Sequence, residues 1–326
     1  MKPSAPPADP SRVEARPSAC SVVVLLPVYN GARYLRPQIE SILQQSHSPV
    51  FILCRDDGST DASVGILQEL QQQWPSHMQV VDDGAGNLGP SGNFSHLMQL
   101  AQSFTPPGHV ASETRYFALS DQDDLWHPDK LERCLREIQR LEHEHPGLPA
   151  LVHSDLRVIA EDGEEIAPSM ARYQGLQTQH AGFAAQLLSS TLTGCTCLMN
   201  HAMLTQALPI PPQAIMHDWW LSLVASAIGC RHYIDEALID YRQHAANAIG
   251  AKAQAKPAKL QGLLWRLFDQ RHREIFQLNA RQAKAFLQRY HHSLSGRQRL
   301  VLRLASLLTL PFPPVQRVVY RTLRRL

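Results

Sequence analysis

Three aspartates within four positions, Asp121, Asp123 and Asp124, form the densest carboxylate cluster of the acidic part of the chain. Neighbouring carboxylates repel each other unless a cation or hydrogen-bond donors compensate their charge, and their hard oxygen ligands suit Mg²⁺ or Mn²⁺. Proteins usually hold Mg²⁺ with one or two carboxylates together with substrate phosphates. The cluster therefore predicts a divalent-metal site, and the alternative is an acidic turn that caps the following helix.

A second polar stretch, Asp56-Asp57-Gly58-Ser59-Thr60-Asp61, is compatible with a plain turn followed by a helix cap. A carboxylate at this place can also accept the imino N–H of a pyrimidine, with the ring of Tyr29 as a stacking face. The Gly-x-Gly-x-x-Gly motif is missing after the first apolar run, which disfavours a dinucleotide site. The phosphate-loop motif Gly-x-x-x-x-Gly-Lys-Ser/Thr is missing as well, which excludes that class of nucleotide site.

Alternating strands and helices must position these side chains. Continuous apolar runs of the kind buried in a parallel sheet alternate with segments of helical spacing. The predicted strands are Ser21–Pro27, Val50–Cys54, Val80–Val81, Tyr116–Ser120 and Leu151–Ile159, and the predicted helices include Tyr34–Gln45, Phe94–Phe104 and Leu131–Leu141. This order predicts a mostly parallel, open α/β sheet flanked by helices, in which ligands bind beyond the carboxyl ends of the strands.

Composition narrows the class of protein. The chain has 326 residues, of which 44% are hydrophobic and 18% charged, so it can bury a large core. No apolar run approaches the roughly 18 residues of a membrane span, and the N-terminus does not resemble a signal peptide. Six scattered cysteines indicate a reduced, cytoplasmic chain, in which Cys195 and Cys197 are expected to be buried. Residues 1–19 are rich in proline and are predicted to be a disordered leader.

Charge is distributed unevenly along the chain. Residues 252–326 hold 16 Lys and Arg against 2 Asp and Glu, a net charge of +14, whereas residues 1–251 carry −12. This difference predicts an acidic body joined to a basic helical segment, residues 251–326, that meets an anionic partner. The apolar face of residues 260–268, with arginines beside it, is typical of a helix in the interface of an anionic membrane. A helical cap packed on the acidic body is the alternative.

The order of the motifs resembles the family 2 glycosyltransferases of the GT-A fold, over residues 20–250. The motifs that carry this resemblance are Pro27-Val28-Tyr29-Asn30, Asp56 to Asp61, Asn87-Leu88-Gly89 and Asp121-Gln122-Asp123-Asp124. Within the family, His217-Asp218-Trp219-Trp220 followed by Tyr241-Arg242-Gln243-His244 is similar to bacterial rhamnosyltransferases of polysaccharide assembly. The Gln-x-x-Arg-Trp signature of processive synthases is missing, which favours transfer of a single sugar.

The resemblance implies a role for each matching residue. Asp218 is the expected catalytic base, which removes the proton of the acceptor hydroxyl, although it can also cap the helix that starts at Trp219. Asp123 and His244 are expected to hold Mg²⁺ or Mn²⁺, although His244 can also be an ordinary surface histidine. The residues expected to bind substrate are Pro27, Tyr29 and Asp57 at the base, Asp121 near the ribose, Gly89 and Asn93 near the donor, and Trp219 and Trp220 at a sugar ring.

The implied activity is that of an inverting, metal-dependent, non-processive glycosyltransferase of cell-surface polysaccharide synthesis. L-Rhamnose from dTDP-rhamnose is the favoured donor sugar, with a UDP-hexose as the alternative. The expected acceptor is a glycan or a lipid-linked oligosaccharide, and the expected location is the cytoplasm, peripheral to the inner face of the membrane. A nucleic-acid binder is disfavoured because the basic segment lacks an aromatic platform. A non-catalytic scaffold is disfavoured because it has no need of Asp57, Asp123, Asp218 and His244 together.

Overall fold

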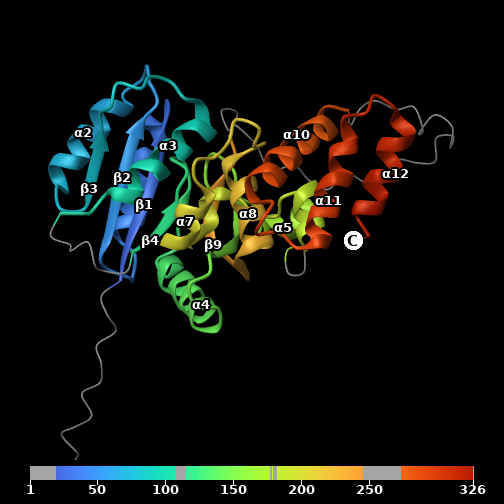
Figure 1. Ribbon diagram of the computed structural model, residues 1–326. Coiled ribbons are helices and arrows are strands. Elements are labelled where there is room, and N and C mark those ends of the chain that lie inside the picture. The colour runs from blue at the N-terminus through green and yellow to red at the C-terminus, as the bar shows by residue number, and fades with distance from the viewer. Residues whose placement is uncertain (1–19, 108–114, 177, 179–181, 245–272, 326) are drawn as a thin grey trace, which may run out of the picture.

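A parallel sheet forms the N-terminal half of the protein. The computed structural model describes residues 20–107, 115–176, 178, 182–244 and 273–325 (Figure 1). In the sheet, β1 lies between β2 and β4, and β3 lies outside β2, all of them parallel. The bounds are β1 Ser21–Val28, β2 Val50–Asp56, β3 Met78–Val81 and β4 Arg115–Leu119.

Strand β1 is buried on both faces, which explains its continuous apolar sequence. Val23 and Leu25 belong to a core on one face of the sheet, which α3 (Gly89–Ser103) covers. Val22 and Val24 belong to a second core on the other face, covered by α1 (Ala32–Leu43), α2 (Ser63–Gln73) and α4 (Lys130–Glu144). Because β1, β2 and β4 are parallel, the polar residues that follow them lie at the same edge of the sheet.

The second half of the sheet is mixed. Strand β8 (Cys197–Asn200) is antiparallel to both of its neighbours, β4 and β6 (Ala150–Ile159). Strand β9 (Cys230–Arg242) then runs parallel to β6 and antiparallel to the short β5 (Leu125–Trp126). The open α/β sheet predicted from the sequence is confirmed, whereas β5, β8 and β9 were not predicted and are additions to it. The remaining elements here are β7 (Glu165–Ala167), α5 (Met170–Gln174), α6 (Phe183–Leu188), α7 (His201–Ala207) and α8 (His217–Ile228).

Three helices at the C-terminal end pack on this body. They are α10 (Arg273–Tyr290), α11 (Gly296–Ser306) and α12 (Pro313–Leu323), at the opposite end of the molecule from β3 (Figure 1). Phe286, Leu302 and Leu323 belong to the same hydrophobic core as Leu25 of β1. Over the described residues the basic segment is therefore a helical cap on the acidic body. The predicted apolar face at 260–268 and the leader 1–19 lie outside the described residues, and the domain boundary near residue 250 stays a prediction.

Among the helices that the structure describes, none combines the length and the apolar character needed to cross a bilayer.

Candidate functional site

A cleft of about 620 Å³ opens at the carboxyl ends of β1, β2 and β4. Its walls come from the loops after these strands, from the N-terminus of α3, from residues 189–194 and from the start of α8. Nine of the residues predicted for the site line it: Pro27, Tyr29, Asp57, Gly89, Asn93, Asp121, Asp123, Asp218 and Trp219. Residues far apart in the sequence thus meet where an open α/β sheet binds its ligands.

Tyr29 is attached to the acidic loop by one glutamine. Its backbone N–H donates to Oε1 of Gln122 over 2.8 Å, and Nε2 of Gln122 donates to the carbonyl of Tyr29 over 2.9 Å. A Cβ on Gly31 would lie 2.4 Å from Oε1 of Gln122, so glycine is required there while this pairing persists. The Tyr29 side chain itself is 50% exposed, which leaves its ring face open to a ligand.

Asp57 is buried and organises the glycine-rich loop. Its Oδ1 accepts the N–H of Leu88 and a guanidinium N–H of Arg55, both over 2.8 Å. Its Oδ2 accepts the N–H of Gly89 over 2.8 Å, and Gly89 has a φ of +71° that favours glycine. A carboxylate has about four acceptor positions, so these contacts leave one on Oδ2. Asp56, in contrast, accepts the N–H groups of Gly58 and Ser59 and holds its own turn.

Arg55 lies beneath Asp57 and is 2% exposed. Its guanidinium donates to Asp57, to Asp83 over 3.1 Å, to the side chain of Asn93 over 3.2 Å and to the carbonyl of Gly86 over 2.8 Å. The amide of Asn93 also donates back to the Arg55 carbonyl over 3.3 Å. Asn93 therefore lines the cleft with a side chain that Arg55 already engages.

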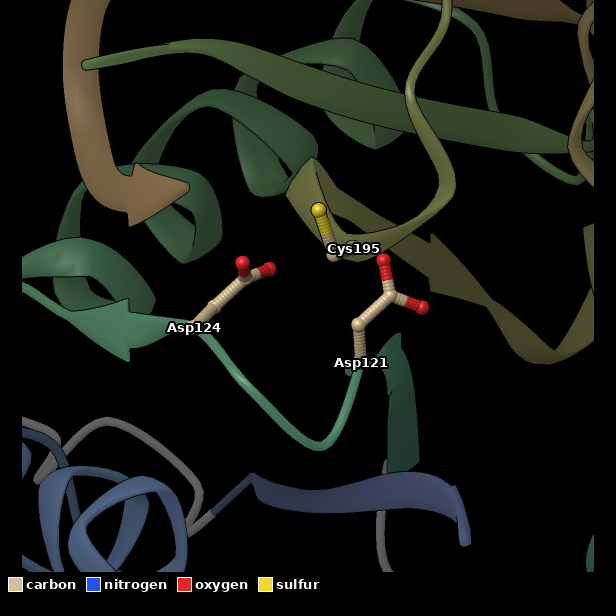
Figure 2. Close-up of side chains that lie close together, drawn as sticks. All are labelled: Asp121, Asp124 and Cys195. Atoms are coloured by element: carbon tan, nitrogen blue, oxygen red, sulfur yellow. The ribbon is translucent and has the colours of Figure 1, made fainter. Parts of the chain in front are cut away.

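The acidic loop after β4 brings several oxygen atoms together. Ligand atoms of Asp121, Asp124 and Cys195 all lie within 4.8 Å of one another (Figure 2). Burial, then repulsion from Asp123 and Asp218, raises the pKa of Asp121 to about 7. Burial also raises the pKa of Asp124 well above its usual value, and its Oδ2 has no hydrogen-bond partner among the described residues. Such an arrangement of carboxylates fits a divalent cation. A cation would compensate the repulsion between the carboxylates and would give Oδ2 of Asp124 a partner.

Asp123 and His244, the two predicted metal ligands, lie in contact. Nε2 of His244 is 2.8 Å from Oδ2 of Asp123, although the residues are 121 positions apart. The imidazole also stacks on the ring of Tyr34, with centroids 5.0 Å apart. His244 is only 9% exposed in its side chain, so it is not an ordinary surface histidine. Their metal-binding role stays a prediction.

Asp218 lies in the first turn of α8, with one residue of the helix before it. Its Oδ2 accepts the N–H of Gly194 over 3.1 Å, and its Oδ1 accepts the N–H of Trp219 over 2.6 Å. Burial raises the pKa of Asp218 to about 6, against these hydrogen bonds, which lower it. Met216 holds the N-cap position, so the alternative that Asp218 is the N-cap of this helix is wrong.

The two adjacent tryptophans lie in different surroundings. Trp219 lines the cleft, and its indole N–H donates to the carbonyl of Gln186 over 2.6 Å. Trp220 is fully buried, donates to the carbonyl of Ala207 over 3.1 Å and packs edge-on against Phe286. The prediction that Trp220 binds substrate is therefore wrong. Successive helical residues point about 100° apart, so the two rings cannot share one face.

Four aspartates line the cleft, Asp57, Asp121, Asp123 and Asp218, whereas no Lys or Arg is among the lining residues that the structure describes. Asp57 is already paired with Arg55, so the repulsion of a multiply charged anion would come mainly from Asp121, Asp123 and Asp218. A phosphorylated ligand can bind against these carboxylates when a cation accompanies it.

Known proteins are similar to this chain in sequence and in fold. The model of the glycosyl transferase family 2 matches residues 23–204, more than half of the chain. The putative teichuronic acid biosynthesis glycosyltransferase TuaG of Bacillus subtilis is 26% identical over 68% of this chain and 78% of its own length. The dTDP-rhamnosyl transferase RfbG of Shigella flexneri is 24% identical over 70% of this chain and 74% of its own length. An uncharacterized glycosyltransferase of Nostoc, alr2836, is 28% identical, and this chain covers 66% of its length.

Solved structures show the same fold. The structure of Staphylococcus aureus TarS 1–349 with UDP matches 94% of this chain and 90% of its own, with a TM-score of 0.50 and 14% identity. The mannosyltransferase PcManGT of Pyrobaculum calidifontis was solved with GDP-Man and Mn²⁺. Its match covers 93% of this chain and 73% of its own chain, with a TM-score of 0.52 and 14% identity. With the family match, these likenesses confirm the predicted fold and class of enzyme: the chain belongs to glycosyl transferase family 2 and is a glycosyltransferase of the GT-A fold.

Proposed function

We propose that the protein is an inverting, metal-dependent, non-processive glycosyltransferase that uses a nucleotide-diphosphate sugar. The observation that carries the metal requirement is the lining of the cleft, with four aspartates and no described Lys or Arg. A diphosphate leaving group brings further negative charge to these carboxylates, so its binding needs a cation.

The donor we favour is dTDP-L-rhamnose, with a UDP-hexose as the alternative. Support for rhamnose comes from the 24% identity to a dTDP-rhamnosyl transferase and from the motif His217 to Trp220. Support for a UDP donor comes from the fold that this chain shares with TarS, solved with UDP-GlcNAc. The acceptor we propose is a glycan or lipid-linked oligosaccharide of cell-surface polysaccharide synthesis, at the inner face of the cytoplasmic membrane.

Base binding would use Pro27, Tyr29 and Asp57. The exposed ring of Tyr29 offers a stacking face, and the remaining acceptor position on Oδ2 of Asp57 suits the imino N–H of a pyrimidine. Gly89 presents its backbone to the donor without a side chain in the way, and Asp121 lies nearby to reach the ribose. Both thymine and uracil carry this N–H, so this end of the cleft accepts either donor.

Asp123 and His244 would hold the cation, with Asp121 and Asp124 at its side. When bound, a divalent cation compensates the charge of the departing diphosphate. Asp123 lines the cleft, and its contact with His244 holds the two side chains together before any ligand enters.

Asp218 would act as the base in a single displacement. Its carboxylate takes the proton of the acceptor hydroxyl, the hydroxyl oxygen forms a bond to the anomeric carbon, and the bond from that carbon to the diphosphate breaks. Attack opposite the leaving group inverts the anomeric configuration. A pKa of about 6 leaves Asp218 ionised at neutral pH and more basic than an exposed aspartate.

The testing experiment is a donor-hydrolysis screen without acceptor. dTDP-rhamnose, UDP-glucose, UDP-galactose and GDP-mannose are each incubated with Mn²⁺, with Mg²⁺ or with EDTA, and nucleotide release is measured. We expect slow release from one donor only with metal, and its loss in Asp123→Ala. Glu69→Ala, which removes an exposed carboxylate on α2, is the matched control and keeps the activity. Full activity in EDTA would overturn the proposed metal requirement. Nucleotide release from the UDP-hexoses alone would overturn the assignment of dTDP-rhamnose as the donor.

A further inference from the structure

Large apolar side chains are exposed on the C-terminal helices, mainly in the turn from α11 to α12. Among the described residues, eleven large hydrophobic side chains are exposed, and five of them lie between positions 300 and 318. They are Leu300 (53% exposed), Leu307 (41%), Leu310 (44%), Phe312 (57%) and Val318 (64%). Leu307, Leu310 and Phe312 follow one another within six positions, with the exposed Pro311 between the last two. We call Leu300, Leu307, Leu310, Phe312 and Val318 the apolar patch.

The apolar patch is not needed for the core of the protein. On α11, Val301, Leu302 and Ala305 face inward and are buried, whereas Leu300, and Leu307 just after the helix, face out. On α12 the inward residues are Val319 and Leu323, whereas Val318 faces out. Leu307, Leu310 and Phe312 expose three large apolar side chains within six positions, beside a complete buried face, and such a cluster indicates a surface that binds a partner.

The charge around the patch selects the kind of partner. From Ile275 to Arg325 the chain has ten Lys and Arg and no Asp or Glu. Arg303, Arg321, Arg324 and Arg325 are exposed on the same two helices and beside their ends. A partner that fits this surface therefore offers negative charge to the arginines and an apolar region to the apolar patch.

We infer that the apolar patch and these arginines dock the protein on an anionic lipid bilayer. Phosphate head groups would contact the arginines, while Leu310 and Phe312 enter the boundary of the acyl chains. A second copy of this chain is a poor occupant, because two such basic faces repel each other. A nucleic acid would engage the arginines but leave the exposed leucines without a partner.

Docking there would also orient the enzyme. Leu302 and Leu323 pack in the same core as Trp220 of α8, the helix that carries Asp218. Because this core is continuous, attachment of α11 and α12 to a membrane fixes the direction of the cleft relative to it. The inference goes beyond the proposed transfer reaction, and it concerns binding rather than turnover.

The test is co-sedimentation of the full chain with vesicles of phosphatidylcholine alone or with 30% phosphatidylglycerol. We expect binding to the anionic vesicles that falls steeply with salt, since interactions beyond about 8 Å are screened at physiological ionic strength. The double variant Leu310→Ser/Phe312→Ser should bind at least about 10-fold more weakly. The triple variant Arg321→Gln/Arg324→Gln/Arg325→Gln should lose about 100-fold, because each basic side chain near an anionic surface contributes about fivefold.

Matched controls change the same residue types elsewhere. Leu148→Ser/Ile166→Ser removes two apolar side chains that are 41% and 43% exposed, and Arg36→Gln/Arg136→Gln/Arg172→Gln removes three surface charges. Both should bind as the wild type does, and all variants should keep the melting temperature and the rate of donor hydrolysis. Wild-type binding by both patch variants would overturn the inference, since docking would then use another segment. Binding to double-stranded DNA without vesicle binding, or a dimer dissociated by Phe312→Ser, would overturn it as well.

Discussion

Gly194 holds Asp218 by a single backbone hydrogen bond. Its N–H donates to Oδ2 of Asp218 over 3.1 Å, across 24 positions of sequence. A Cβ on Gly194 would lie 2.9 Å from Nε2 of His217 and 3.4 Å from Cβ of Asp218. The same glycine therefore orients the proposed base and leaves the space that the neighbouring imidazole occupies.

Asp218→Asn should separate catalysis from folding. Asn cannot accept a proton at neutral pH, so turnover should fall by about 10²–10⁴-fold while donor affinity is kept. Asn has one acceptor oxygen for the N–H groups of Gly194 and Trp219, so the variant should lose about 1 kcal/mol of stability. The measurements are turnover, donor affinity and melting temperature, with Asp162→Asn in an exposed turn as the control. Turnover within about twofold of wild type would exclude Asp218 as the base.

Gly194→Ala should disturb the base without removing it. The added methyl meets His217 and Asp218, and a displacement of about 1 Å at a reacting group can cost 10²-fold in rate. We expect a 10- to 100-fold lower kcat with an unchanged KM for the donor. Gly65→Ala is the control, because a Cβ there meets nothing within 4 Å. An unchanged kcat would show that the position of Asp218 does not depend on Gly194.

Gln122→Ala should weaken donor binding more than it slows the reaction. It removes both hydrogen bonds that join Tyr29 to the acidic loop, each worth about 1 kcal/mol. We expect the Kd of the nucleotide to rise about 10-fold, measured by calorimetry in the presence of Mn²⁺. The control Gln139→Ala changes an exposed glutamine on α4. An unchanged nucleotide Kd would mean that Tyr29 keeps its place by other contacts.

Acid should destabilise the protein through Asp240 on β9. Burial favours its neutral form, but hydrogen bonds from His127 and Arg157 outweigh this and lower its pKa from 3.8 to about 2. A carboxyl with a lowered folded-state pKa stabilises the fold above pH 4, and this stability is lost between about pH 4 and pH 2.

Asp240→Asn should accordingly lose about 2 kcal/mol of unfolding free energy at pH 7. The difference from wild type should shrink as the pH falls from 4 toward 2, which urea unfolding at several pH values measures. The control Asp162→Asn should show no such dependence. A difference that stays constant down to pH 3 would contradict the assignment of this acid sensitivity to Asp240.

The strands of the parallel sheet were predictable because burial on both faces leaves a continuous apolar run. Strand β8 was not, because it has four residues, and its antiparallel insertion between β4 and β6 depends on contacts far away in sequence. For the same reason local patterns could not identify Gln122 or Gly194, whose partners are 93 and 24 positions distant. The burial of Trp220 did have a signal. Leu223 and Val224, three and four positions after Trp220, continue its face of the helix and are both apolar.

Arg55 gives the donor end of the cleft its rigidity. One buried guanidinium holds Asp57 after β2, Asp83 and the Gly86 carbonyl in the loop after β3, and Asn93 in α3. The loop that carries Gly86 cannot move away unless several of these bonds break together. A nucleotide that bound here would meet a loop that these bonds already hold in place, so it would have to order little of that loop. The entropic cost of ordering this loop is therefore met mostly when the protein folds, and little of it remains for the step in which the donor binds.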